Sequence, residues 1–399
     1  MRRSTESRNP MYKIRTYNQI SNIGLSRFPM DKYLVGPDLD DPEAFILRSQ
    51  KLHEVDVPAS LLAVARAGAG VNNIPVEEYT RRGIVVLNTP GANANAVKEL
   101  VAVALLLGSR RIFEGMSRVQ ELTDVGDSAL MAQQLEKEKK QFAGSEIAGK
   151  TLGVVGLGAI GSMVANMALE LGMHVAGFDP ALSVEAAWRL SSQVEKMESL
   201  DALLKISDFV TLHVPAIEQT RHLISASAIP RFKPGAKLLN FAREEIVDVD
   251  AVISALDQGR LSAYISDFPL PVLLGRKDCL LFPHLGASTA EAEENCSVMA
   301  ADQLMDFLEN GNIVNSVNYP QTRMARSGGY RITFANANVP RVLGRVLSVL
   351  ADHDVNVIDM VNKSLHDMAY NIIDVESRPT PEIIEKIAHA DGVMHVRVI

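Results

Sequence analysis

Cysteine, long apolar runs and a basic excess are all scarce in this sequence, and each shortage excludes a class of protein. Only two cysteines, Cys279 and Cys296, occur in 399 residues, so no disulfide framework can form and a reducing, cytoplasmic setting is expected. Neither cysteine lies in a metal-ligand pattern, and we expect no metal. No stretch approaches the roughly 18 apolar residues of a membrane span, which predicts a soluble protein.

The charge balance argues against polyanionic partners. Lys and Arg number 40 against 48 Asp and Glu, for a net charge of −8, so we expect neither a nucleic-acid nor a membrane partner. An anionic substrate therefore needs a local basic pocket. The basic start, residues 1–10, leads into no apolar signal core, so we expect a disordered tail there or a translation start at Met11.

Length and patterning predict several domains. The chain exceeds one ordinary domain, and between Ile14 and Leu87 short apolar runs alternate with helix-like segments, which is a βα rhythm. Residues 94–111 are apolar nearly all round, which predicts a helix buried between domains. Residues 120–148 are polar and carry a lysine cluster, which favours a solvated helix over a binding site.

A second βα series begins at Thr151 and predicts a parallel, doubly wound sheet. A long helix from Ser288 to about Asn310 then returns the chain to the first domain, which makes that domain discontinuous. Residues 319–329 have the composition of a linker. Beyond them, the order strand, helix, strand, strand, helix, strand predicts a ferredoxin-like module.

The run VVGLGAIGSMVANMALELGMHVAGFDP carries the clearest functional pattern. Gly156, Gly158 and Gly161 form G-x-G-x-x-G directly after an apolar strand and at the head of a helix, where a pyrophosphate can approach the positive helix end. Asp179 lies about 20 residues further on, where a carboxylate accepts hydrogen bonds from ribose hydroxyls and repels a 2′-phosphate. The pattern predicts NAD rather than NADP, the alternative being a βα turn without a ligand.

Two side chains that suit the oxidation of a hydroxy acid follow later strands of the same series. Arg243, in NFAREEIVD, and His284, in FPHLGAST, each lie just past the carboxyl end of a strand, and so at the crevice of a parallel sheet. Imidazole can take the hydroxyl proton, and guanidinium can grip a carboxylate through two hydrogen bonds. Either residue alone has a structural alternative, but the shared sheet edge favours a catalytic pair.

Seven motifs in order resemble the D-2-hydroxyacid dehydrogenase family, most closely its phosphoglycerate dehydrogenase branch with a C-terminal ACT domain. The resemblance covers nearly all of the chain after Met11. It implies an α/β fold with a flavodoxin-like discontinuous substrate domain (11–97 with 290–318), a Rossmann NAD-binding domain (98–289) and a ferredoxin-like ACT domain (328–399). The motifs are RAGAGVNNI, NTPGANANAVKEL, GLGAIG, HVP, NFAREEIVD, SDF and PHLGAST.

The resemblance also implies roles for individual residues. Arg243 would orient the substrate carboxylate and carbonyl, and His284 would be the acid and base. The implied cofactor contacts are Gly156, Gly158, Ala159, Ile160, Gly161, Asp179, Phe241, Ala242, Gly286 and Ala287, with Asp267 on the nicotinamide carboxamide. The implied substrate contacts are Arg48 and Ser49 for a phosphate, the backbone N–H groups of Ala69 and Gly70 for the carboxylate, and Asn93 beside them. For Arg48 and Ser49 the alternative is an ordinary charged strand end.

The sequence departs from the family pattern at two places. The family pairs its catalytic histidine with a glutamate four or five residues after the aspartate that matches Asp267, but Pro271 and Val272 stand there. Such a carboxylate orients the imidazole and favours its charged form, so we expect altered and weaker turnover. Glu244 stands where the family has glycine, and we consider that it either pairs with Arg243 or reaches His284 in place of the missing partner.

The C-terminal module resembles an ACT domain, which binds small effectors, often amino acids, at a paired interface. Asn338 and Asn356 match two asparagines of serine-regulated phosphoglycerate dehydrogenases, and Asn336 stands in place of their histidine. The resemblance implies a serine effector site. The alternative is that these are buried amides which satisfy backbone turns.

The leading functional prediction is the NAD-dependent oxidation of D-3-phosphoglycerate to 3-phosphohydroxypyruvate, the first step of serine biosynthesis. One alternative keeps the chemistry and changes the substrate, for instance to 4-phosphoerythronate. Another is a catalytically weak sensor of NAD and an amino acid. The resemblance implies a homodimer or homotetramer, with residues 94–111 and the ACT module as candidate contact surfaces.

Overall fold

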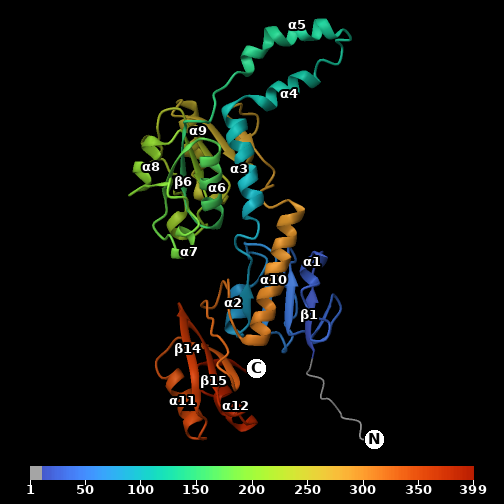
Figure 1. Ribbon diagram of the computed structural model, residues 1–399, viewed down its shortest axis with the longest axis vertical. Coiled ribbons are helices and arrows are strands. Elements are labelled where there is room, and N and C mark those ends of the chain that lie inside the picture. The colour runs from blue at the N-terminus through green and yellow to red at the C-terminus, as the bar shows by residue number, and fades with distance from the viewer. Residues whose placement is uncertain (1–10) are drawn as a thin grey trace. The chain divides into compact units, whose positions relative to one another are not determined.

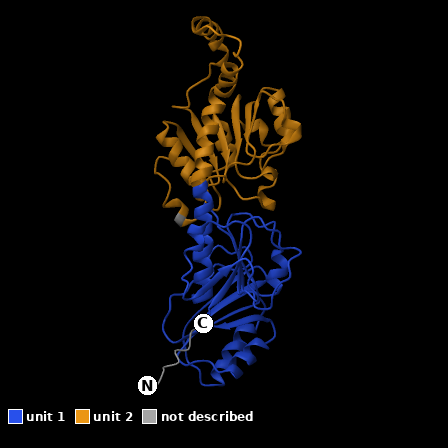
Figure 2. Ribbon diagram, turned by 90° about the vertical axis from the view of Figure 1, so that its right-hand side faces the viewer, with its two compact units in different colours: residues 1–92, 290–399 blue, residues 93–289 orange. Residues whose placement is uncertain are grey.

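A computed structural model describes residues 11–399, and the chain divides into two compact units (Figure 1, Figure 2). Unit 1 contains the chain up to Ala92 and from Ala290 to Ile399, and unit 2 contains Asn93–Thr289. The expectations for residues 1–10 lie outside the described residues. Among the helices formed by residues 11–399, none is long and apolar enough to cross a membrane.

The first sheet of unit 1 has five parallel strands in the order β2-β1-β3-β4-β5, which is the predicted flavodoxin-like order. Its central strands are continuous apolar runs because both faces of the sheet are covered. Its elements are β1 (Tyr12–Thr16), α1 (Asn22–Leu25), β2 (Tyr33–Gly36), β3 (Ala44–Leu47), β4 (Ala63–Arg66), α2 (Val76–Arg81), β5 (Val85–Leu87) and α10 (Ala290–Asn310).

The C-terminal module forms a four-stranded antiparallel sheet in the order β14-β15-β13-β16, which confirms the predicted ferredoxin-like arrangement. Ile332, Phe334 and Ile373 on one face of the sheet pack with Val346 and Ile383 of its two helices. Its elements are β13 (Tyr330–Ala337), α11 (Val342–Ala351), β14 (Val357–Leu365), β15 (Met368–Val375), α12 (Pro381–Ala388) and β16 (Val393–Val398).

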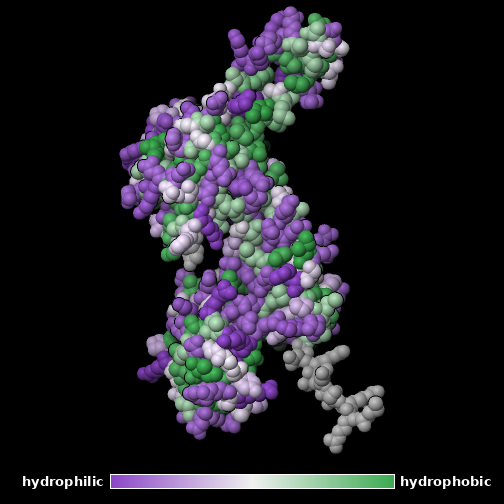
Figure 3. All heavy atoms as spheres, in the orientation of Figure 1, coloured by the Kyte–Doolittle hydropathy of each residue, from purple (hydrophilic) through white to green (hydrophobic). Residues whose placement is uncertain are grey.

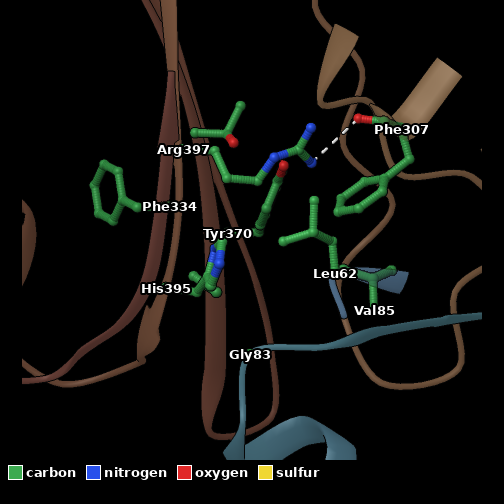
Figure 4. A pocket seen from close by; sticks show the side chains of 10 residues that line it. Leu62, Gly83, Val85, Phe307, Phe334, Tyr370, His395 and Arg397 are labelled. Carbon is green, nitrogen blue, oxygen red and sulfur yellow. Dashed lines mark hydrogen bonds between the residues drawn. The ribbon is translucent and has the colours of Figure 1, made fainter. Parts of the chain in front are cut away.

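The opposite face of the module's sheet packs against the first sheet and α10. Tyr370 and Ile372 of β15 belong to the same hydrophobic core as Phe307 of α10. Figure 4 shows the side chain of Arg397 reaching toward the carbonyl of Phe307 in this contact. The segment predicted to be a linker is packed at its start, since Tyr319 is fully buried. The module is therefore an integral layer of unit 1.

Polar contacts from the module and the preceding segment satisfy the end of α10. The last carbonyls of a helix have no hydrogen-bond donor within the helix. Here four side chains act as the donors, and three of them are arginines, whose positive charge complements the helix dipole. The bonds run from Arg397 to the carbonyl of Leu308 (2.8 Å), from Arg326 to Glu309 (2.8 Å), from Arg331 to Asn310 (2.9 Å) and from Tyr370 to Gly311 (2.8 Å).

Unit 2 is built on a seven-stranded parallel sheet in the order β12-β11-β10-β9-β6-β7-β8, which confirms the doubly wound Rossmann prediction. The short elements β8, α7 and α8 are additions to the predicted set. The elements are β6 (Thr151–Val155), α6 (Ala159–Glu170), β7 (His174–Phe178), α7 (Val184–Ala187), β8 (Glu195–Lys196), α8 (Leu200–Ile206), β9 (Phe209–Leu212), β10 (Ala236–Asn240), α9 (Val249–Asp257), β11 (Leu261–Ser266) and β12 (Cys279–Leu281). Short 3-10 turns occur at η1 (Lys139–Phe142), η2 (Glu218–Thr220), η3 (Ile229–Arg231), η4 (Glu244–Ile246) and η5 (Pro271–Leu273).

The helices that precede this sheet differ in burial. α3 (Ala94–Ser109) packs on α6, but its Val103 and Leu106 are exposed by 45% and 43%, so the prediction of burial all round is wrong. α4 (Ile112–Gln120) follows it, and the polar segment, residues 120–148, then forms α5 (Ser128–Glu138). Neither helix buries a residue, which confirms the solvated prediction for the polar segment. Figure 3 shows hydrophobic side chains on the surface of this helical pair.

Candidate active site

The carboxyl ends of the unit 2 strands collect the predicted cofactor and catalytic residues. Gly156 follows β6, Asp179 follows β7, residues 241–243 follow β10, Asp267 follows β11 and His284 follows β12. Because the strands are parallel, these residues share one edge of the sheet. The chain leaves β6 toward β7 on one side and returns to β9 on the other, which is the switch point where such sheets bind ligands.

The glycine turn is open where a diphosphate would lie. Gly156 has a φ of +89°, and a Cβ there would lie 2.8 Å from the carbonyl carbon of His213. A Cβ at Gly161 would lie 1.9 Å from the carbonyl oxygen of Gly156, so neither position admits a side chain. Gly158 begins α6 without a side-chain cap and faces open space. The first N–H groups of α6 are therefore available to an anion.

Asp179 lies against the glycine turn. Its Oδ2 accepts a hydrogen bond from the N–H of Leu157 at 2.8 Å, and its Oδ1 accepts one from the N–H of Ala181 at 2.9 Å. A carboxylate has about four acceptor sites, so two bonds leave capacity for ribose hydroxyls. The turn and this carboxylate together fit an NAD molecule.

Arg243 stands in an exposed loop that a buried amide organises. Asn240 is fully buried and its Nδ2 donates to the carbonyl of Arg243 at 2.8 Å. The Nη1 of Arg243 donates to the carbonyl of Ala242 at 2.7 Å. Glu244 is exposed and, among residues 11–399, forms an ion pair with neither Arg243 nor His284, so both considered roles for Glu244 are wrong. Sequence reasoning missed Asn240, whose only local signal is a polar residue ending an apolar strand.

His284 is exposed and adopts a left-handed backbone conformation with φ of +58°. Its ring meets the ring of Phe268 edge-on, with 5.1 Å between the centroids. Within the described chain no carboxylate forms an ion pair with His284, and the family's glutamate position falls in η5, which begins at Pro271. The carboxylate of Asp267 instead accepts hydrogen bonds from the backbone of the loop that carries His284.

His213 is a further candidate that the sequence reasoning left without a role. It follows β9, and its Nε2 lies 2.9 Å from the hydroxyl of Thr211. Its Nδ1 is buried and has no hydrogen-bond partner among the described residues. Burial lowers the pKa of His213 to about 3, so the imidazole is neutral. His213 packs closely against the glycine turn: a Cβ added at Gly161 would lie 3.4 Å from the Cβ of His213.

The predicted substrate contacts of unit 1 gather at the carboxyl ends of β3 and β4. Arg48 follows β3 and forms an ion pair with Glu293 at 2.5 Å. The N–H of Ser49 donates to the side chain of Asn18 at 3.0 Å. Among residues 11–399, none accepts a hydrogen bond from the N–H of Ala69 or Gly70, which leaves both donors for an anion. The remaining candidate, Asn93, begins α3 in unit 2 without making a side-chain cap.

Arg66 joins this group although sequence reasoning did not select it. It ends β4, directly opposite Leu47 of β3, and its Nε donates to the carbonyl of Arg48 at 3.0 Å. Its guanidinium lies beside the loop of Gly68, where a Cβ would come within 2.5 Å of its Nη1. The available signal was an arginine at the end of a strand next to the strand of Arg48. Two arginines therefore end neighbouring strands.

The three effector candidates do not form one cluster within a module. Asn336 is buried, and its Oδ1 accepts from Asn371 at 2.7 Å. Asn338 follows β13 at the end where Ala337 pairs with Met368, and it donates to the carbonyl of His366 at 3.0 Å. Asn356 precedes β14 at the other end, where Val357 pairs with Val375. Asn338 and Asn356 thus lie at opposite ends of the sheet.

Comparisons with known proteins identify the family of the chain. Residues 105–286 match the family described as "D-isomer specific 2-hydroxyacid dehydrogenase, NAD binding domain". The D-3-phosphoglycerate dehydrogenase of Escherichia coli strain K12 is 30% identical over 385 residues, 93% of this chain and 89% of the relative. The enzyme of the same name from Methanocaldococcus jannaschii is 32% identical over 81% of this chain, which covers 60% of that longer relative.

Two solved structures are similar at 25% identity. One is the NAD+-bound 3-phosphoglycerate dehydrogenase of Entamoeba histolytica, with a TM-score of 0.60 over 77% of this chain and 99% of that one. The other is the apo D-mandelate dehydrogenase of Rhodotorula graminis, with a TM-score of 0.64 over 80% of this chain and 100% of that one.

Proposed function

Since this chain belongs to the D-isomer-specific 2-hydroxyacid dehydrogenase family of NAD-binding enzymes, we propose that it oxidises D-3-phosphoglycerate to 3-phosphohydroxypyruvate, the first step of serine biosynthesis. The observation that carries the proposal is the placement of Arg243 and His284 on the sheet edge that also holds the glycine turn. The identity of 30% to the Escherichia coli enzyme over most of both chains supports the choice of substrate.

Arg243 and His284 divide the chemistry between them. The guanidinium of Arg243 binds the substrate carboxylate and the oxygen on C2, which fixes the plane of the reacting carbon. The imidazole of His284 takes the proton of the C2 hydroxyl as the carbonyl forms. NAD, when bound, accepts the hydride from C2. The O–H and C–H bonds at C2 break as the C=O bond forms, with the proton passing to His284 and the hydride to the cofactor.

The cofactor contacts of the proposal follow the sheet edge. Gly158 and the N–H groups of Ala159 and Ile160 receive the diphosphate, and Asp179 receives the adenosine ribose. The other proposed contacts, toward the nicotinamide, are Phe241, Ala242, Gly286 and Ala287.

The proposed substrate contacts include a basic site for the phosphate group of the substrate. Arg48 and Arg66 at neighbouring strand ends form a basic pair for the phosphate, with Ser49 beside them. The unpaired N–H groups of Ala69 and Gly70 suit the carboxylate, with Asn93 assisting. Because Glu293 already pairs with Arg48, a phosphate has to displace that carboxylate.

Two alternatives have an observation in their favour. The similarity to D-mandelate dehydrogenase at the same 25% identity allows another D-2-hydroxy acid, such as 4-phosphoerythronate. The lack of an ion pair between His284 and a carboxylate among the described residues favours a weak enzyme that senses NAD and an amino acid. The retained pair Arg243 and His284 favours turnover.

We further propose a cytoplasmic homodimer or homotetramer whose C-terminal module, residues 328–399, is a regulatory domain. Phe113 and Met116 of α4 are exposed by 64% and 63%, which suits a subunit contact. Because Asn338 and Asn356 lie at opposite ends of one sheet, a serine site with both requires two modules paired in opposite directions. Isothermal titration that detects no serine binding at millimolar concentration would remove serine from the proposal.

The deciding experiment follows NADH formation with a panel of D-2-hydroxy acids. We expect D-3-phosphoglycerate to be the best substrate, and Arg243→Ala to abolish turnover. Arg48→Ala and Arg66→Ala should each raise KM about 10- to 100-fold for phosphorylated substrates only, the loss expected for a charged hydrogen bond. Arg82→Ala, which removes an exposed arginine paired with Glu78, is the control. Preference for an unphosphorylated acid would overturn the choice of substrate.

A further inference from the structure

We propose that Asp267 is a positioning residue that holds the loop of His284 in its working conformation. The proposal rests on the function assigned above to His284 as acid and base. Asp267 does not take the proton itself; His284 keeps that role. It identifies what orients the histidine in a chain without the family's partner glutamate.

The carboxylate of Asp267 is clamped by two successive backbone amides. Its Oδ1 accepts from the N–H of Leu285 at 2.7 Å, and its Oδ2 accepts from the N–H of Gly286 at 2.8 Å. Asp267 is only 3% exposed, so water competes little for these bonds. Successive N–H groups that converge on one anion form a nest, and such bonds to a carboxylate are short and strong.

This clamp acts on the residues that directly follow His284. The φ of +58° at His284 is uncommon for a residue with a side chain, so the loop needs compensating contacts. The two bonds to Asp267 supply them. The imidazole itself touches Phe268, the neighbour of Asp267, with ring centroids 5.1 Å apart. Both the backbone and the ring of His284 are thus fixed by residues 267 and 268.

Asp267 is in turn fixed by the loop of Arg243. Its N–H donates to the carbonyl of Asn240 at 3.1 Å, and the side chain of Asn240 donates to the carbonyl of Arg243 at 2.8 Å. Asn240 is fully buried. One buried network therefore sets the relative placement of the proposed base and the proposed carboxylate ligand, which is the quantity that catalysis by orientation depends on.

A contact of Asp267 with the nicotinamide carboxamide makes different predictions. If Asp267 acts through His284, its removal should lower kcat and leave the affinity for NAD unchanged. If it acts on the carboxamide, its removal should weaken NAD binding, and the loss should shrink with an NAD analogue that carries an acetyl group in place of the carboxamide. The two roles are therefore separable.

The test compares Asp267→Asn and Asp267→Ala with the full-length wild type. We expect kcat to fall about 10²-fold, as for a small misplacement of a catalytic group, with an unchanged NAD dissociation constant by fluorescence titration. In a His284→Ala background the same changes should cause no further loss, because residues that act as a unit are not additive. Amide hydrogen exchange of residues 283–287 should accelerate in both single variants.

Two further variants sharpen the test. Gly286→Ala should share the phenotype in weaker form, because its Cβ would come within 3.0 Å of the Oδ2 of Asp267. Asp208→Asn is the matched control: that carboxylate also accepts a backbone N–H, from Thr151 at 2.9 Å, and pairs with Lys233 at 2.7 Å, but at the opposite edge of the sheet. It should leave kcat and the exchange of residues 283–287 unchanged.

Unchanged exchange in residues 283–287 of Asp267→Ala, or an additive loss on top of His284→Ala, overturns the proposal. A wild type that turns over no hydroxy acid refutes the proposed function instead. In that case hydrogen exchange alone still decides whether Asp267 holds the loop.

Discussion

Replacing Arg331 by methionine should destabilise unit 1 more than the removal of any surface arginine. Arg331 is fully buried in β13, and its guanidinium binds both oxygens of Asp374, at 2.6 and 2.8 Å. It also donates to the carbonyls of Asn310, Met324 and Ala325. Arg331→Met removes all of these bonds and leaves the carboxylate of Asp374 buried without its cation.

The size of the effect follows from that geometry. Breaking a buried ion pair by removing one partner costs about 3–5 kcal/mol, which for a unit of this size corresponds to a fall in Tm of roughly 6–20 °C. Asp374→Asn should cost less, because Arg331 keeps its carbonyl acceptors. The double variant should cost less than the sum of the two single changes.

Urea and thermal unfolding of the full chain measure these differences. The control is Arg345→Met, whose ion pair with Asp391 is exposed by 47% and 89% and should contribute below about 1 kcal/mol. If Arg331→Met costs no more than this control, the module is not anchored through the buried pair and the reasoning is refuted.

The ion pair between Arg331 and Asp374 makes the stability of the protein depend on pH. Burial alone raises the pKa of Asp374, but the bonds from Arg331 and the N–H of Ser327 outweigh burial, so the pKa of Asp374 lies below its ordinary value of 3.8. A lowered carboxyl pKa adds stability that is complete above the unfolded value and is lost as the pH falls below it. We therefore expect the difference between wild type and Asp374→Asn to shrink below about pH 4.

Four further predictions concern the site. Asp179→Ala should weaken cofactor binding about 10- to 100-fold through loss of hydrogen bonds to a charged group, and titration with the fluorescent reduced cofactor NADH measures it; an unchanged dissociation constant would contradict the ribose assignment. His213 has a pKa of about 3 against 6.5 unfolded, so the unfolded state binds more protons between these values and stability should fall by about 2 kcal/mol from pH 6.5 to pH 5. His213→Gln should make the free energy of unfolding nearly independent of pH between about pH 6.5 and pH 5. An equally steep dependence on pH in this variant would exclude the histidine as its cause. Glu293→Gln should lower KM for phosphorylated substrates because Arg48 loses its competing carboxylate, whereas a raised KM would show that Glu293 orients the arginine. Pro271→Glu should raise kcat because it returns a carboxylate to the family's position beside His284, and steady-state rates across pH measure the gain. No gain would show that Asp267 and Phe268 already orient the histidine.

Much of the fold could be predicted because its signals are local. The parallel strands are continuous apolar runs, such as Ala44–Leu47 and Thr151–Val155, and glycines follow them where turns are tight. The order of strands and helices then allows few right-handed topologies. The glycine turn and Asp179 were predictable for the same reason, since both lie within one βαβ unit.

The missed features depend on contacts between distant residues. Nothing near Arg331 in the sequence shows that it meets Asn310 and Asp374, so the packing of the module on α10 was not predictable from composition. The exposure of Val103 contradicts a prediction made from the hydrophobicity of α3 alone. The separation of Asn338 from Asn356 follows from strand register, which the order of elements does not reveal. Asp267 could be selected by its motif, but its bonds to Leu285 and Gly286 require coordinates.

Hydride transfer itself is the most direct test of the proposed reaction. The wild type is incubated with NAD and D-3-phosphoglycerate that carries deuterium on C2, and the nicotinamide product is analysed by mass spectrometry. We predict that the deuterium appears in the reduced cofactor and that Arg243→Ala and His284→Ala prevent the transfer. Bound NAD that stays free of deuterium, in a folded wild-type protein, would contradict the account.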